Sequence, residues 1–199
     1  MCKYQAVGES GWGSNGAAID ILIPNFTQLY LSTDGVAFNV FFTNFGSTSV
    51  IEAGVLYGWF SYCNATVPYY FLYGTINDGT TESADCDQSL PAYGNYYWVR
   101  AFQISGRGYS RIENGSQQNI WQKDWGNYNP GYAQDKTTAE IHQYSSSYPY
   151  WDGTVNMFHA SWLDNNNHWN YWSFTNVSDD CPYHAAWYSS DAWQASYRC

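Results

Sequence analysis

The chain reads Val50-Ile51-Glu52-Ala53-Gly54-Val55-Leu56-Tyr57-Gly58, a stretch typical of a strand inside a β-sheet. Its branched and aliphatic side chains pack well on a pleated surface. One carboxylate, Glu52, interrupts the apolar residues. A bare carboxylate is costly to bury, so we expect Glu52 to be paired, hydrogen-bonded or protonated.

Short apolar or alternating runs recur along the chain, separated by clusters of Gly, Asn, Asp, Ser and Pro. No long stretch has the helical period of 3.6 residues. The pattern predicts an all-β chain forming one domain over residues 1–199, as a sandwich, jelly roll or barrel. Turn signals are Asn77-Asp78-Gly79 and Arg107-Gly108, and the predicted strands are 17–24, 36–42, 50–57, 69–76, 96–104, 138–144, 156–163 and 169–175.

The charge of the chain excludes some partners. There are 17 Asp and Glu residues against 7 Lys and Arg, so a nucleic acid is not an expected partner. No apolar run reaches the roughly 18 residues of a membrane helix, so we expect a soluble protein. The start, Met1-Cys2-Lys3-Tyr4, reads as an initiator Met before a mature sequence. Nothing in the sequence fixes the oligomeric state.

The chain has five cysteines and four histidines, residue types that form disulfides and metal sites. No C-x-x-C or H-E-x-x-H motif occurs, and His142, His159, His168 and His184 lie in different segments, so neither a metal nor a cofactor is expected. Cys63 and Cys86 bracket a predicted hairpin, and Cys181 and Cys199 bracket the C-terminal segment. We predict these two disulfides and an extracellular location, with Cys2 left over, although the spacing does not fix the pairing.

A second acid, Glu140, lies in the strand-like run Thr137-Thr138-Ala139-Glu140-Ile141. Two carboxylates in half-buried strands are a pattern that favours acid–base chemistry. The residues around them also resemble known families. The runs Ile51-Glu52-Ala53-Gly54 and Tyr70-Phe71-Leu72-Tyr73 resemble the neprosins, and residues 106–114 followed by Thr138-Ala139-Glu140 are similar to the eqolisins. Both families are glutamic peptidases, and eqolisins carry Gln at the position of the first Glu.

The resemblance implies an antiparallel β-sandwich of jelly-roll (concanavalin-like) form with a cleft on its concave face. It implies that Glu52 and Glu140 are the catalytic residues of a secreted, acid-acting endopeptidase. In that reading Glu140 is the general base and a protonated Glu52 stabilises the oxyanion. The neprosin likeness adds a preference for Pro. A peptide or protein is the expected substrate, contacted by side chains on the same strand faces: Tyr69, Phe71, Tyr73 and His142.

The sequence departs from both families. The paired glycines of neprosins are absent before Glu140, and Phe71 or Leu72 stands where eqolisins have a further acid. Glu113 is therefore a rival for the second catalytic position.

Three other interpretations remain open. Glu52 is compatible with an ordinary strand residue that faces solvent or pairs with an Arg. Two Glu residues in a cleft are also what a jelly-roll glycosidase uses. A non-catalytic glycan-binding or structural sandwich is the third, since the aromatic residues of 169–172, Trp187-Tyr188 and Trp193 suit either core packing or a sugar-stacking patch.

Overall fold

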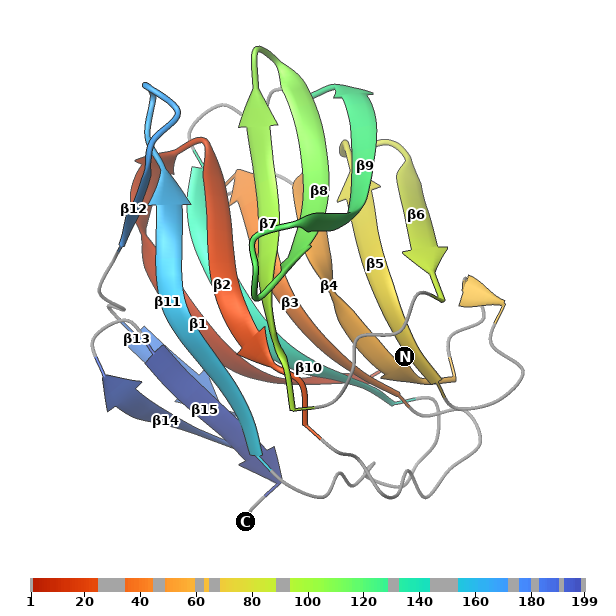
Figure 1. Cartoon of the computed structure of the whole chain (residues 1–199), viewed down its shortest axis with the longest axis vertical. Coiled ribbons are helices and arrows are strands. Elements are labelled where there is room, and N and C mark those ends of the chain that lie inside the picture. The colour runs from red at the N-terminus through yellow and green to blue at the C-terminus, as the bar shows by residue number, and fades with distance from the viewer. Residues whose placement is uncertain are drawn as a thin grey trace.

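Two antiparallel β-sheets face each other in the structure of the chain (Figure 1). The computed structural model describes residues 2–24, 35–44, 49–59, 63–64, 69–88, 94–128, 133–143, 154–171, 176–179, 183–189 and 192–197. The predicted all-β class and the antiparallel sandwich are confirmed. Among the described residues no helix is long and apolar enough to cross a membrane.

The first sheet has seven strands and contains the stretch with Glu52. Each strand is hydrogen-bonded to its neighbours in the order β13 (Asn176–Asp179), β1 (Cys2–Ser14), β10 (Ala133–Gln143), β3 (Gly35–Asn44), β4 (Val50–Gly58), β5 (Tyr69–Asn77) and β6 (Glu82–Asp87). The register is regular through β10, β3, β4 and β5. Cross-strand partners in this region therefore share one face of the sheet.

The second sheet has eight strands and covers one face of the first (Figure 1). Its order is β14 (Tyr183–Ser189), β15 (Ala192–Tyr197), β11 (Thr154–Leu163), β2 (Gly16–Leu22), β7 (Tyr96–Ile104), β8 (Arg107–Asn114) and β9 (Asn119–Asn127), and β12 (Trp169–Tyr171) pairs with β11 off this path.

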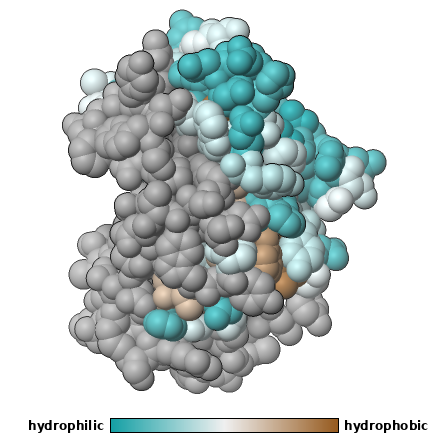
Figure 2. Space-filling model, turned by 90° about the vertical axis from the view of Figure 1, so that its left-hand side faces the viewer, coloured by the Kyte–Doolittle hydropathy of each residue, from teal (hydrophilic) through white to brown (hydrophobic). Residues whose placement is uncertain are grey.

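The main core lies between the two sheets because one side chain in two points inward from each strand. Phe38, Ile51 and Val55 of the seven-stranded sheet pack in one buried cluster with Ile19, Met157 and Trp193 of the other sheet. On the face shown in Figure 2, the described residues are mainly hydrophilic and apolar residues appear only in small areas. Apolar side chains thus point into the core and polar ones to the surface, which is the alternation from which the fold was predicted.

The predicted strands correspond to β2, β3, β4, β5, β7, β10, β11 and β12, with shifted ends, and residues 172–175 of the last one lie outside the described residues. The strands β1, β6, β8, β9, β13, β14 and β15 were not predicted. The strand β1 contains three glycines, and its register against β10 shifts around Trp12, so it has no regular alternation that would predict a strand. The turn predicted at Arg107-Gly108 lies two residues earlier in the structure, at Ser105-Gly106. Ser105 and Gly106 have φ of 53° and 72°, values suited to a tight hairpin turn, and β8 begins at Arg107.

The predicted Cys63–Cys86 disulfide is confirmed. Cys86 lies in β6, and Cys63 packs against the face of the seven-stranded sheet that points away from the core. Cys181 and Cys199 lie outside the described residues, so their pairing stays a prediction. Asn77-Asp78-Gly79 connects β5 to β6 as expected.

Replacing both Cys63 and Cys86 by Ala should lower the free energy of unfolding by about 3 kcal/mol, because the bond closes a long loop in the unfolded chain. Urea denaturation would measure the difference. Ser83→Ala, an exposed change in the same strand, should stay within about 0.5 kcal/mol of the wild type. Equal stability of the double variant and the wild type would contradict this account.

Candidate functional site

Glu52 lies on the outer face of β4, the face directed away from the eight-stranded sheet. Its neighbours Ile51 and Ala53 are fully buried in the core between the sheets, and side chains alternate along a strand. Glu52 itself is half-buried. The strand therefore directs the Glu52 carboxylate away from the core, to the outer surface of the sheet, where solvent reaches part of it.

Three side chains from the two neighbouring strands bind the Glu52 carboxylate. The Asn39 amide of β3 and the Tyr73 hydroxyl of β5 both donate to Oε1. The Thr75 hydroxyl of β5 donates to Oε2 over 2.9 Å. Asn39 Nδ2 also donates to the Tyr73 oxygen over 2.7 Å, so the Tyr73 proton is directed to Glu52. Hydrogen bonds donated to a carboxylate favour its ionised form.

Gly54 makes this network possible. It follows Glu52 on the same face of β4, paired with Asn39 on one side and Tyr73 on the other. A Cβ at Gly54 would come within 2.5 Å of Tyr73 Cε1 and 2.8 Å of Asn39 Cβ. The Tyr73 ring and the Asn39 side chain therefore occupy the space that any other residue would fill, which explains the Glu-Ala-Gly sequence.

The backbone of Glu52 is fixed from the opposite side by the eight-stranded sheet. Ser110 of β8 is completely buried and donates a 2.6 Å hydrogen bond to the Glu52 carbonyl oxygen. The Trp125 indole of β9 donates to the same Ser110 hydroxyl over 2.8 Å. The position of Glu52 thus depends on both layers of the sandwich.

The register puts Glu140 on the same sheet face as Glu52 but not beside it. Glu140 pairs with Ala37 of β3, which pairs with Leu56 of β4. Glu52 is thus two strands and four positions away, or about 16 Å between Cα atoms in a flat sheet. Gly54, Asn39 and Thr138 occupy the row between them.

The residues expected to contact a substrate share this face, since Phe71, Tyr73 and Tyr69 alternate with inward residues of β5. His142 follows Glu140 on the same side of β10. Phe71 and Tyr73 are each only 1% exposed, in a cluster with Leu56 and the disulfide. Tyr73 therefore supplies its hydroxyl to Glu52 rather than an exposed ring.

Glu113, the rival for the second catalytic position, belongs to the other sheet. It is 2% exposed and forms ion pairs with Arg100 and, at 2.6 Å, with Arg111. Burial lowers the pKa of Arg100, and the Glu113 charge opposes that effect. Glu113 is thus part of a buried ion pair that is remote from Glu52.

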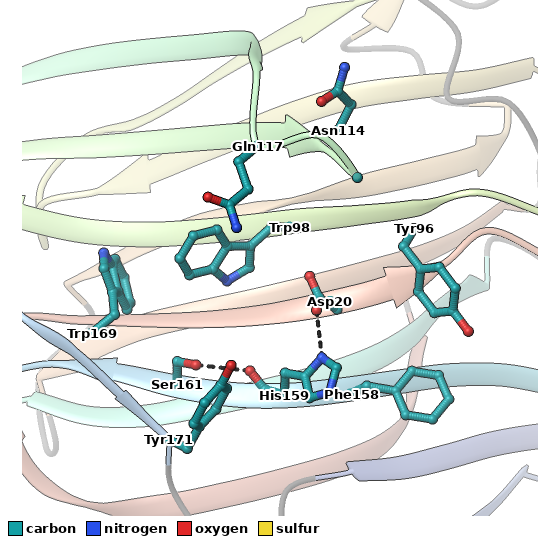
Figure 3. Close-up of a pocket in the computed structure, with 11 residues that line it drawn as sticks. Asp20, Tyr96, Trp98, Asn114, Gln117, Phe158, His159, Ser161, Trp169 and Tyr171 are labelled. Atoms are coloured by element: carbon teal, nitrogen blue, oxygen red, sulfur yellow. Dashed lines mark hydrogen bonds and ion pairs between the residues drawn. The ribbon is translucent and has the colours of Figure 1, made fainter.

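A pocket of about 540 Å³ lies on the outer face of the eight-stranded sheet (Figure 3). It contains an acid–histidine pair, with Asp20 Oδ2 2.8 Å from His159 Nδ1. Burial raises the pKa of Asp20, opposed by the hydrogen bond from His159 and by the charges of His159 and Arg100. Sequence reasoning missed this pair because its members are 139 residues apart and no motif links them.

His159 has a φ of 51°, unusual for a residue with a side chain, and lies where the β11–β2 register shifts. This register shift places the His159 side chain among the aromatic side chains of the pocket. Among the described residues no three His, Cys, Asp or Glu side chains form a group that could hold a metal ion.

Solved structures of other proteins share this fold. Scytalido-glutamic peptidase, crystallised with a peptide-based transition-state analogue, aligns with a TM-score of 0.63 at 12% sequence identity, over 98% of this chain and 97% of that one. SCP-B, an eqolisin-family peptidase in complex with the tripeptide Ala-Ile-His, aligns with a TM-score of 0.62 at 11% identity over the same shares. The CBM2 module of the evolved Dit of Lactobacillus casei BL23 phage J-1 gives a TM-score of 0.50 at 12% identity, over 98% of this chain and 70% of that one.

The chain therefore has the β-sandwich fold of the eqolisin glutamic peptidases, as the resemblance implied. At these identities the likeness is one of fold. No protein-family model matches the sequence, and no curated protein matches it. The likeness to neprosins stays a prediction.

Gly54→Ala should destabilise the protein by about 1–3 kcal/mol, because the new Cβ would overlap Tyr73 and Asn39. Urea denaturation would measure the loss. Gly115→Ala is a suitable control, because the nearest atom to a Cβ there would be the Tyr96 carbonyl oxygen at 3.8 Å. Equal stability of the two variants would show that Gly54 is not needed for this packing.

Proposed function

We propose that the chain is a secreted, acid-acting glutamic endopeptidase in which Glu52 and Glu140 are the catalytic carboxyl groups. The observation that supports this best is the half-buried Glu52 carboxylate with Asn39, Tyr73 and Thr75 as donors, in a sandwich with the fold of glutamic peptidases. The Cys63–Cys86 disulfide supports an extracellular location.

Glu52 is the general base of the proposed reaction. Asn39, Tyr73 and Thr75 all donate to its carboxylate, and donated hydrogen bonds favour the form that can accept a proton. This is the reverse of the role implied by the resemblance, in which Glu52 was protonated. The carboxylate takes a proton from a water molecule as the water oxygen bonds to the scissile carbonyl carbon.

Glu140 is the proposed general acid. It gives its proton to the leaving amide nitrogen as the carbon–nitrogen bond breaks, and exchange with solvent then restores both carboxyl groups. The two residues act on different atoms, so their carboxyl groups need not touch. The proposal requires the Glu140 side chain to reach toward Glu52 across the row of Gly54, Asn39 and Thr138.

The proposed substrate is an extended peptide lying across β4, β3 and β10 between the two acids. A preference for Pro follows from the neprosin resemblance. Activity requires an ionised Glu52 and a protonated Glu140, so it should be highest in acid and fall as Glu140 loses its proton. Acid activity also agrees with the low number of basic residues, since a protonated chain would repel itself only mildly.

Hydrolysis of a denatured Pro-rich protein at about pH 3 and pH 7, with pepstatin present, would test the proposal. Cleavage is expected at pH 3. Glu52→Gln and Glu140→Gln should each lower the rate by at least about 100-fold, because each removes a general acid or base. Glu82→Gln is the control, an exposed acid of β6 in the same sheet, and it should retain full activity.

A fully active Glu52→Gln variant would refute the proposed site. Loss in Glu52→Gln with full activity in Glu140→Gln would refute only the role of Glu140. If intact folded protein cleaves no peptide at either pH but hydrolyses a polysaccharide, the glycosidase interpretation replaces the proposal.

Tyr73→Phe should move the acid limb of the kcat/KM profile to higher pH. The change removes one donor from the Glu52 carboxylate, so Glu52 becomes protonated at a higher pH and the active form is lost sooner on acidification. Profiles of both proteins over the acid range would measure the shift. A lower rate with an unmoved acid limb would show that Glu52 is not the group titrating there.

A further inference from the structure

We infer that the pocket around Asp20 and His159 binds a neutral carbohydrate chain, at a site separate from Glu52. Its lining comes from β2, β7, β11, β12 and the turn between β8 and β9 (Figure 3). These residues lie on the outer face of the eight-stranded sheet, whereas Glu52 lies on the outer face of the seven-stranded sheet. The two sites therefore face opposite sides of the sandwich.

Aromatic rings form the walls of the pocket, and contacts between them fix their positions. Trp98 meets Trp169 edge-on at 5.8 Å, and Tyr96 meets Phe158 at 5.9 Å. The Arg100 guanidinium stacks on Trp98 with 3.6 Å to the ring centroid, which holds that indole from one side. Such preorganised rings bind a flat apolar surface with little loss of side-chain entropy.

Tyr171 is the most exposed ring of the pocket, with 73% of its surface accessible. It lies 5.9 Å from the His159 ring, at the border of the pocket. Tyr96 of the same pocket is also exposed, and several exposed rings that line one concave site are typical of a ligand-binding groove. The face of a sugar ring that carries C–H groups can stack on the flat apolar face of the tyrosine ring.

Polar groups stand between the rings at positions suited to hydroxyl groups. Asp20 and His159 lie between Phe158 and Tyr171, and the Gln117 amide lies over Trp98 in Figure 3. Carboxylate, amide and imidazole together accept and donate hydrogen bonds, as do the hydroxyls of a sugar. Gln117, like His159, has a positive φ, at 59°, a conformation that costs energy for a residue with a side chain.

The charges of the pocket favour a neutral ligand over a charged one. Asp20 is the one carboxylate among the pocket residues that the structure describes, and it is already hydrogen-bonded to His159. The Arg100 charge is paired with Glu113 beneath the aromatic floor. No Lys or Arg is among the described residues that line the pocket, so an anionic ligand would meet no counter-charge there.

A peptide bound here would gain no backbone hydrogen bonds from a strand ladder. Addition of a peptide strand to a sheet needs a free edge. Here β2 pairs with β11 and β7, and β7 pairs with β2 and β8, so both long edges of these strands are already hydrogen-bonded. Only side chains remain for recognition, and most of them are rings.

Tryptophan fluorescence titrations of the full chain with cellohexaose, xylohexaose and chitohexaose would test the inference, with a Pro-rich peptide in parallel. We expect saturable binding of at least one oligosaccharide. Tyr171→Ala should weaken it at least tenfold, whereas Tyr171→Phe, which keeps the ring, should stay within about threefold. Asp20→Asn should also weaken binding.

Two controls separate this site from the proposed peptidase. Ile120→Ala removes an exposed apolar side chain of β9 outside the pocket and should bind like the wild type. Glu52→Gln should lose peptide hydrolysis but keep sugar affinity. The inference is overturned if none of the three sugars binds at millimolar concentration, if Tyr171→Ala binds sugar like the wild type, or if only the peptide binds and Tyr171→Ala abolishes that.

Discussion

Both faces of β4 are covered, and this constraint organises the molecule. Its inward residues close the core between the sheets, while on its outer face the Glu52 carboxylate is bound by side chains of the neighbouring strands β3 and β5. A strand buried on only one side would leave Glu52 in water, where its geometry would not be fixed. A strand buried by apolar groups on both sides could not keep a carboxylate at all. The hydrogen-bond donors of β3 and β5 permit the intermediate case.

The Glu52 network is tied to the whole sandwich rather than to one strand. Asn39 and Tyr73 reach Glu52 across Gly54, and Ser110 holds the Glu52 carbonyl from the opposite layer. The seven-stranded sheet thus positions the carboxylate while the eight-stranded sheet fixes the backbone beneath it. Preorganisation of this kind is what acid–base catalysis requires, because the reacting group must not need to reorganise during the reaction.

The two outer faces of the sandwich differ in chemistry. The face with Glu52 presents a carboxylate whose hydrogen-bond partners are fixed, next to a disulfide-linked apolar cluster. The other face presents a pocket of rings around an acid–histidine pair. A protein with both an enzymatic and a carbohydrate-binding face would be held near substrates embedded in a polysaccharide matrix. The shared core explains why one fold supports two separate sites.

The sequence by itself determined the class of fold and the central strands, and it singled out Glu52 as an acid in an apolar strand. These are local properties, because alternation of period two and a lone acid in an apolar run can be recognised within a few residues. It did not identify β1, whose glycines and register shifts hide the alternation. It gave no sign of the Asp20–His159 pair, whose members meet only after β11 has paired with β2. The tertiary structure alone decided which donors surround Glu52 and how far along the sheet Glu140 lies, because strand register depends on contacts between distant segments of the chain.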